Sequence, residues 1–196
     1  MRPIAEAYKD FPILHKEHNG YRVIYLDSGA TAQIPQSVID RVVEHMTQRN
    51  GNPHRGSHIL AIEASEDYEN ARDRVVEFIN AREREEVIFT RNSTESMNLI
   101  AHSYGLHNVK KGDKIVITVA EHHANLVTWQ YVAEQTGATL EYMYLDEHGH
   151  LKDGEINKID EKTKIVAFAH VSNVLGMEFP VKELTEKAHS VGAIVV

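Results

Sequence analysis

The chain has 196 residues, of which 42% are hydrophobic and 26% are charged, a composition typical of a folded globular domain rather than of a disordered chain. Its formal net charge is −8, from 21 basic and 29 acidic residues, and its longest basic run is Lys110-Lys111. We therefore expect neither nucleic acid nor an anionic membrane surface as a partner.

The chain contains no cysteine, which excludes disulfides, cysteine-ligated zinc and a thiol nucleophile within these residues. The first residues, MRPIAEAYKDFPIL, lack the apolar segment of a secretory signal, and no apolar run approaches the length of a membrane span. The default expectation is a cytoplasmic protein.

The N-terminal part predicts helices more clearly than strands. Residues 23–35 indicate a strand followed by a loop of small residues, and residues 51–58, GNPHRGSH, indicate a loop broken by glycine and proline. Residues 36–50 and 62–81 have the apolar spacing of amphipathic helices. We expect these helices to pack beside a sheet or against a partner subunit.

From residue 86 onward, short apolar runs alternate with helical patterns. The expected strands are 86–90, 114–119, 138–145, 164–171 and 193–196. The expected helices are 93–105, 124–137, 180–192 and a weaker one within 152–162. This alternation predicts an α/β fold with a mainly parallel sheet. The last strand pattern stops at Val196 without a turn or polar tail, so we expect a truncated chain or the N-terminal piece of a longer one.

Ligands of open parallel sheets bind outside the carboxyl ends of the strands, so the residues that follow each strand matter most. In RNSTES, Ser93 and Thr94 stand at a predicted helix start, where free N–H groups, the helix dipole and two hydroxyls can hold a phosphate. The alternative is a plain capping box, in which Asn92 caps the helix and Glu95 reaches back. The Glu95 carboxylate would repel a phosphate unless it points away.

The stretch AEHHAN follows the next strand and contains His122 and His123. Adjacent helical residues face different directions and no HExxH motif is present, so we expect no metal site. Either histidine can be a capping or surface residue. The functional alternative is that His122, nearest the strand end, faces the ligand crevice, stacks on a flat ring and transfers a proton.

Two further polar residues are candidates. Asn173, in HVSNVLG, follows a third strand, and its amide can hydrogen-bond a phenolic oxygen of a ligand. The alternative is a turn residue that satisfies its own backbone. Arg55, in NPHRGSH, carries a guanidinium that suits a carboxylate or phosphate, and the alternative is a solvated loop arginine.

Taken together, the motifs YLDSGATAQIP, HRGSH, YENAR, FTRNSTESMNLIAHSYG, EHHANLVTWQ and HVSNVLG resemble the N-terminal half of a pyridoxal-phosphate (PLP)-dependent cysteine desulfurase. The likeness is to the SUF-type (group II) branch, which includes selenocysteine lyases, and it runs from about residue 8 to residue 196. It implies the large domain of a fold-type-I, class-V aminotransferase. Residues 1–196 would be its N-terminal segment and the first part of the PLP-binding domain, without the rest of that domain or the small C-terminal domain.

The resemblance also implies roles for the candidate residues. Ser93 and Thr94 match the residues that hold the cofactor phosphate. His122 matches the catalytic histidine that stacks on the pyridine ring and takes part in proton transfer. Asn173 matches the asparagine near the phenolic oxygen. Arg55 falls in a loop near the active site, where it would contact the substrate or the subunit interface of a homodimer.

Some family features are not found in this sequence. The aspartate that pairs with the pyridine nitrogen, the lysine that anchors the cofactor, the sulfur-accepting cysteine and the substrate-clamping arginine all lie beyond Val196 in the family. We therefore expect this chain alone to be inactive and not to hold PLP covalently. Asn92 replaces a glycine usual in the family and Met177 replaces a threonine, and asparagine tolerates left-handed backbone well enough that the first change is not expected to disable the site.

The function implied for the whole enzyme is the conversion of L-cysteine to L-alanine. The sulfur would pass through an enzyme persulfide to a SUF-type acceptor protein for iron–sulfur cluster assembly. A selenocysteine lyase, or another class-V aminotransferase-like PLP enzyme acting on a related amino acid, is the second hypothesis. A catalytically inert fragment or dimerising remnant is the third.

Overall fold

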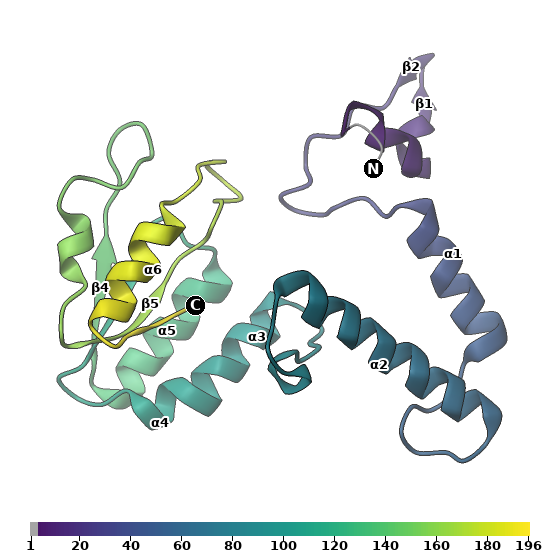
Figure 1. Cartoon of the computed structure of the whole chain (residues 1–196). Coiled ribbons are helices and arrows are strands. Elements are labelled where there is room, and N and C mark those ends of the chain that lie inside the picture. Colours follow the sequence, from purple (N-terminus) through teal and green to yellow (C-terminus); the bar gives the residue numbers. More distant parts are fainter. Residues whose placement is uncertain (1–3) are drawn as a thin grey trace. The chain divides into compact units, whose positions relative to one another are not determined.

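The computed structural model describes residues 4–196, which form two compact units. The first unit ends at Phe89 and the second begins at Thr90. Figure 1 shows helices α1 and α2 in the first unit and the sheet with its covering helices in the second. Within residues 4–196, no helix combines the length and the apolar character that crossing a bilayer requires.

The first unit opens with a small hairpin that the sequence reading missed. Two 3-10 turns, Ile4–Asp10 and Pro12–His15, precede strands β1 (Glu17–His18) and β2 (Tyr21–Arg22), which pair antiparallel. The connecting Asn19 and Gly20 have φ angles of 52° and 78°. Asparagine followed by glycine is the preferred pair for a two-residue hairpin with left-handed turn residues, so this dipeptide was the available signal.

The strand predicted after this hairpin is wrong. Residues 23–28 have no strand partner among the described residues, and the side chains of Ile24 and Leu26 are 78% and 92% exposed. An extended segment needs both pairing and a buried face to be stable. Here only Val23 is paired, by one hydrogen bond from its N–H to the Lys16 carbonyl at 3.0 Å, so β-rich composition alone does not produce a strand.

Both helices predicted for the first unit are confirmed. Helix α1 (Gln36–Glu44) continues as a π-helical turn over His45–Arg49, and α2 spans Ile59–Ile79. Asp67 of α2 binds Arg41 at 2.6 Å and Arg49 at 2.9 Å, which ties the two helices together. The loop between them needs a glycine at residue 51, because an added Cβ would lie 2.3 Å from the Leu60 carbonyl oxygen. A 3-10 turn, Arg84–Glu86, follows α2.

The second unit is built on a parallel sheet of four strands, as the alternating pattern predicted. Its strands are β3 (Lys114–Thr118), β4 (Thr139–Met143), β5 (Thr163–Ala167) and β6 (Ile194–Val195), in the spatial order β4-β3-β5-β6. All three neighbouring pairs are parallel. The strand predicted at residues 86–90 does not form, because no strand among the described residues pairs with it.

Helices cover both faces of this sheet (Figure 1). They are α3 (Ser93–Ile100), its π-helical extension Ala101–Gly105, α4 (Leu106–Asn108), α5 (His123–Thr136), the 3-10 turn Glu155–Lys158 and α6 (Val181–Ser190). Gly137 and Gly192, each with left-handed φ, follow α5 and α6 as the sequence indicated.

Alternate residues of the central strands supply two cores. Ile115 and Ile117 of β3 pack with Trp129 of α5 on one face, whereas Val116 packs with Leu184 of α6 on the other. The apolar runs of β3 and β5 therefore reflect burial on both faces, as expected of a parallel sheet covered by helices.

The strand order places a chain reversal between β3 and β5. From β3 the chain passes through α5 to β4 on one side, and from β5 it passes through α6 to β6 on the other. The loops that leave the carboxyl ends of β3 and β5 therefore diverge, and the point where strand order reverses in this way is where ligands of such sheets bind.

A half-buried ammonium at the opposite end of β3 joins two further elements. Lys114 Nζ lies 2.8 Å from Glu141 Oε2 on β4 and 2.8 Å from Asp160 Oδ2 in the loop before β5, and the Lys114 side chain is 14% exposed. The hydrogen bond from Lys114 is the main reason that the pKa of Asp160 lies below its usual value. This ion pair is a stability contribution that depends on pH.

We expect Asp160→Asn to lower the free energy of unfolding by about 0.5 kcal/mol at neutral pH, because the pair is partly exposed and screened. A carboxylate whose folded pKa is lowered stabilises above its unfolded pKa and loses that contribution as pH falls through its folded pKa. The difference from wild type should therefore vanish in acid. Urea denaturation at several pH values measures this, with the exposed Asp153→Asn as control, and a difference that persists in acid would contradict it.

Candidate functional site

The start of α3 is a capped helix terminus. Asn92 precedes the helix, and its Oδ1 accepts a hydrogen bond from the Glu95 backbone N–H at 2.9 Å. The capping function of Asn92 is therefore confirmed. Its φ of −170° is extended, so this position does not use the left-handed tolerance of asparagine that the sequence reading invoked.

Glu95 turns away from the helix axis toward Arg91. Its Oε2 accepts hydrogen bonds from the Arg91 backbone N–H at 2.6 Å and from the Arg91 Nε at 3.2 Å. The backbone N–H of Arg91, followed by its side chain, holds the pKa of Glu95 below its usual value. Glu95 thus reaches one residue beyond the capping asparagine, and its charge is matched by a guanidinium instead of facing an anion at the helix start.

Ser93 and Thr94 are left free to receive a ligand. Both residues are exposed, and neither hydroxyl is hydrogen-bonded to any part of residues 4–196. Within the same residues, their backbone N–H groups have no acceptor, as is usual in the first turn of a helix. Two hydroxyls and two N–H groups at a positive helix end form a set of donors suited to a phosphate.

His122 occupies the corner between β3 and α5. Its Nδ1 accepts a hydrogen bond from the Ala124 backbone N–H at 3.0 Å, so the imidazole is the N-cap of α5. The capping alternative is therefore confirmed for this residue. Because Nδ1 acts as the acceptor, the neutral ring carries its hydrogen on Nε2. The ring is exposed, which leaves its face and Nε2 accessible.

Asn173 lies in a tight turn between Val171 and Glu178, which form an isolated antiparallel bridge. The turn is satisfied by Ser172, whose hydroxyl accepts from the Leu175 N–H at 3.2 Å and whose carbonyl accepts from the Gly176 N–H at 2.8 Å. The alternative reading of Asn173 as a residue that satisfies its own turn is therefore wrong. Its exposed amide has no hydrogen-bond partner within residues 4–196.

Glu121 is bonded beside the candidate residues and was not among those predicted from the sequence. It directly precedes His122, and its Oε1 accepts a hydrogen bond from the Ala169 backbone N–H at 3.2 Å. Ala169 follows β5 and begins the segment that leads to Asn173. The only sequence signal was an acidic residue just beyond a strand end, which by itself has many explanations.

Arg55 belongs to the first compact unit, whereas the other four predicted residues belong to the second. Its side chain is exposed and makes no ion pair within residues 4–196. Its neighbour His54 anchors the loop, with a φ of 62°, a hydrogen bond from its N–H to Ser65 Oγ at 2.8 Å and a contact of 3.2 Å from Nε2 to Glu69. Arg55 therefore directly follows a residue that is anchored to α2.

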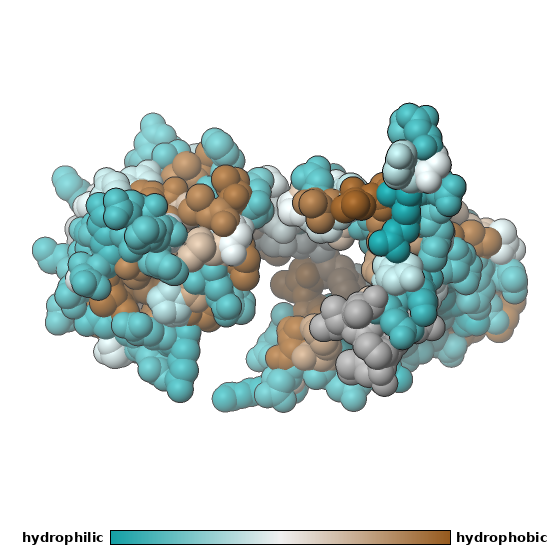
Figure 2. Space-filling model, turned by 90° about the horizontal axis from the view of Figure 1, so that it is seen from above, coloured by the Kyte–Doolittle hydropathy of each residue, from teal (hydrophilic) through white to brown (hydrophobic). Residues whose placement is uncertain are grey.

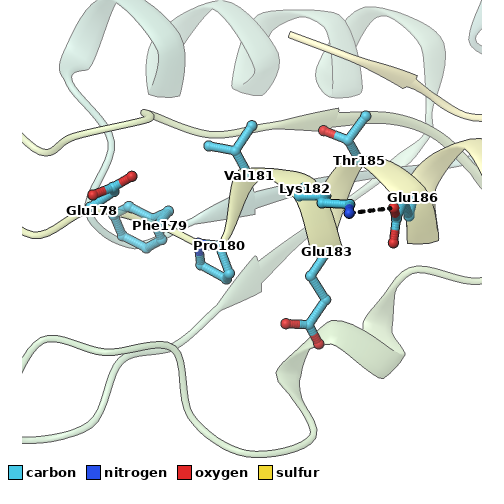
Figure 3. A pocket seen from close by; sticks show the side chains of 8 residues that line it. All are labelled: Glu178, Phe179, Pro180, Val181, Lys182, Glu183, Thr185 and Glu186. Carbon is cyan, nitrogen blue, oxygen red and sulfur yellow. Dashed lines mark ion pairs between the residues drawn. The ribbon is translucent and has the colours of Figure 1, made fainter.

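A surface hollow at the start of α6 contains none of the predicted residues (Figure 3). It is lined by the carboxylates of Glu178, Glu183 and Glu186 and by Lys182, which pairs with Glu186 at 3.9 Å. This excess of negative charge disfavours a phosphate ligand. Among residues 4–196, no group of three or more histidine, cysteine, aspartate or glutamate side chains is arranged to hold a metal ion.

Each of the candidate groups matches one part of a flat ligand that carries a phosphate. Ser93 and Thr94 supply free donors for the phosphate, and the glutamate beside them is neutralised by Arg91. His122 offers an accessible ring held in one orientation, and Asn173 offers an amide without a partner within residues 4–196. PLP combines a phosphate, a planar ring and a phenolic oxygen, which these three kinds of group match.

Comparisons with known proteins agree with this chemistry. Residues 24–196 match the family model described as aminotransferase class-V. The chain is 46% identical over 194 residues to a probable cysteine desulfurase of Synechocystis, covering 98% of this chain and 46% of that protein. It is 50% identical over 192 residues to a probable cysteine desulfurase of Halalkalibacterium halodurans, covering 97% of this chain and 47% of that protein.

Solved structures give the same result. The apo structure of cysteine desulfurase from Thermococcus onnurineus superposes with a TM-score of 0.89 at 39% identity, covering 100% of this chain and 47% of that one. The cysteine desulfurase CsdA of Escherichia coli gives a TM-score of 0.83 at 34% identity, covering 100% of this chain and 48% of that one. The chain therefore spans about half the length of the relatives it matches.

The cap at His122 can be separated from the imidazole itself. We expect His122→Ala to lower the free energy of unfolding by about 1 kcal/mol, because α5 loses its N-cap acceptor. His122→Asn should cost much less, because asparagine is a good N-cap. Chemical denaturation followed by circular dichroism measures both, with His123→Ala, one residue into the helix, as control. Equal losses for the alanine and asparagine variants would contradict the capping role.

Proposed function

The chain belongs to the class-V aminotransferase family, and from this premise we propose that it is the N-terminal part of a PLP-dependent cysteine desulfurase. The observation that carries the proposal is the identity of 46% and 50% to proteins named probable cysteine desulfurases, extending over 98% and 97% of this chain. The polar groups at the starts of α3 and α5 and in the turn after β5 support it as well, because they match the chemical groups of PLP.

The phosphate of PLP would be held at the start of α3. The hydroxyls and backbone N–H groups of Ser93 and Thr94 would donate to its oxygens, and the helix dipole favours negative charge there. The pairing of Glu95 with Arg91 supports this placement, because it removes the carboxylate that would otherwise repel the phosphate. The asparagine cap at Asn92 already satisfies the Glu95 N–H, so the donors nearest the solvent remain for the ligand.

The ring of PLP would lie against His122, and Asn173 would donate to its phenolic oxygen. The hydrogen bond from the Ala124 N–H to Nδ1 orients the imidazole, and the neutral ring presents its Nε2–H as a hydrogen-bond donor on the exposed edge. When bound, PLP supplies an electron sink that stabilises negative charge on the amino-acid carbon next to it. His122 would move the proton that this chemistry requires.

The reaction proposed for the whole enzyme takes L-cysteine to L-alanine. The carbon–sulfur bond of the substrate breaks, a sulfur–sulfur bond forms on a cysteine thiol of the enzyme, and the released proton goes to the alanine product. No cysteine occurs in these 196 residues, so that thiol would lie outside them. The proposed destination of the sulfur is a SUF-type acceptor in the cytoplasm, for iron–sulfur cluster assembly.

A homodimer is part of the same proposal. Val38, Val42 and Met46 of α1 and its π-helical turn are exposed apolar side chains, and apolar areas appear at the surface in Figure 2. Such groups support a surface that is covered in the whole protein. Arg55, exposed beside the anchored His54, is proposed to contact the substrate or the subunit interface.

The whole protein tests the reaction. With PLP present it should convert L-cysteine to equal amounts of L-alanine and transferable sulfur, measured as alanine and, in the presence of a reducing thiol, as sulfide. L-serine, which lacks the sulfur, is the matched control substrate. Release of alanine from L-selenocysteine but not from L-cysteine would favour a selenocysteine lyase instead, and release from neither would refute both assignments.

The 196-residue chain should bind PLP reversibly, because the proposed ligands within it act through hydrogen bonds and ring contact. Ser93→Ala combined with Thr94→Val should weaken binding by about tenfold or more, since hydrogen bonds to a charged phosphate are lost. Quenching of Trp129, the only tryptophan, by added PLP measures the affinity. Thr139→Val, at another exposed threonine, is the control. Visible absorbance that survives desalting would contradict reversible binding.

A further inference from the structure

A single carboxylate, that of Glu121, is hydrogen-bonded to β3, to α5 and to the segment that follows β5. Glu121 Oε1 accepts hydrogen bonds from the hydroxyl of Thr118, at the end of β3, and from the backbone N–H of Ala169, just after β5. Its Oε2 accepts from Asn125 Nδ2 of α5 at 2.7 Å. Thr118 is fully buried and Asn125 is 6% exposed, whereas Glu121 and Ala169 are half-buried, so the bonds lie partly within the core. The carboxylate therefore links the carboxyl ends of β3 and β5, between which the strand order reverses.

The direction of the Asn125 bond is imposed by the core. Trp129 is fully buried, and its indole Nε1–H donates to Asn125 Oδ1 at 2.6 Å. An indole N–H can only donate, so the amide oxygen of Asn125 must face the tryptophan and its NH₂ group must face Glu121. The buried ring thus dictates that residue 121 present an acceptor toward α5.

The second oxygen is constrained in the same way. The Ala169 backbone N–H can only donate, so residue 121 must also present an acceptor toward β5. Glutamine has one acceptor oxygen and one NH₂ group. In either orientation its NH₂ group would meet another donor, Asn125 Nδ2 or the Ala169 N–H. Only a carboxylate satisfies every partner at once.

From this arrangement we propose that Glu121 is a positioning residue for the cofactor site. It rests on the proposed function, and it adds a residue that touches neither the phosphate nor the ring. Glu121 directly precedes His122, and Ala169 begins the segment that carries Asn173. The carboxylate bonds to the ends of both strands. It thereby sets the position of the His122 imidazole relative to the turn that carries Asn173.

The test starts from Glu121→Gln in the 196-residue chain, with Glu134→Gln as the matched control. Glu134 is exposed on α5, the helix that follows Glu121, and has no ion pair within residues 4–196. The indole N–H resonance of Trp129, the only tryptophan, should shift in the first variant and not in the second. PLP affinity, measured by Trp129 quenching, should fall about tenfold in the first variant and stay unchanged in the second.

The double variant Glu121→Gln with Asn125→Asp separates the effect of the hydrogen-bond pattern from the effect of a negative charge at residue 121. The introduced glutamine would accept from Thr118 and Ala169 through its oxygen and would donate through its NH₂ group to the introduced aspartate. The other oxygen of that aspartate would accept from Trp129. Every partner is again satisfied, and the net charge equals that of wild type. We expect this reversed pair to restore PLP affinity to within about twofold of wild type.

Three results would overturn the proposal. Wild-type affinity in Glu121→Gln, even with reduced thermal stability, would leave Glu121 a structural residue only. A double variant that binds PLP as weakly as Glu121→Gln would show that charge at position 121 matters instead of the bond network. If wild type itself shows no PLP binding and the whole protein no desulfurase activity, the proposed function fails and this inference fails with it.

Discussion

The reversal of strand order between β3 and β5 is the constraint on which the rest of the second unit depends. Because β4 and β6 lie on opposite sides of this pair, the loops that leave β3 and β5 diverge and no crossover covers their ends within residues 4–196. At this reversal the Ala169 backbone N–H, just after β5, has no strand to pair with in the described part of the chain. The Glu121 carboxylate accepts a hydrogen bond from that N–H. One side chain thus satisfies the backbone and lies beside the proposed ligand site.

Helices α3 and α5 begin with different capping side chains. Helix α5 is capped by His122, the group proposed to contact the ring, so the cap and the proposed ligand contact share one imidazole through different atoms. Helix α3 is capped by Asn92, and Ser93 and Thr94 keep their donors. Since an anion needs free donors and a ring needs an oriented face, each arrangement matches the part of PLP proposed to bind there.

Sequence patterns predicted the second unit well because its elements carry local signals. The apolar runs of β3 and β5, and the glycines that follow α5 and α6, report burial and helix ends directly. The strands expected at residues 23–28 and 86–90 failed for a non-local reason, since a strand exists only when another strand pairs with it. The hairpin at Asn19-Gly20 carried a local signal that was overlooked.

The candidate residues were predicted from the same kind of local signal. Ser93, Thr94, His122 and Asn173 follow strand patterns, and polar residues at strand ends are a local signal. Glu121 was not predictable, because its importance depends on Trp129 forcing the orientation of Asn125 and on an N–H that is distant in sequence. Every buried side-chain polar atom described in residues 4–196 has a hydrogen-bond partner. Reversing the donor and acceptor of one bond in such a network would therefore leave a neighbouring group without its partner. A buried donor in the core thus specifies the chemistry of a residue beside the proposed ligand site, and family likeness alone does not reveal that dependence.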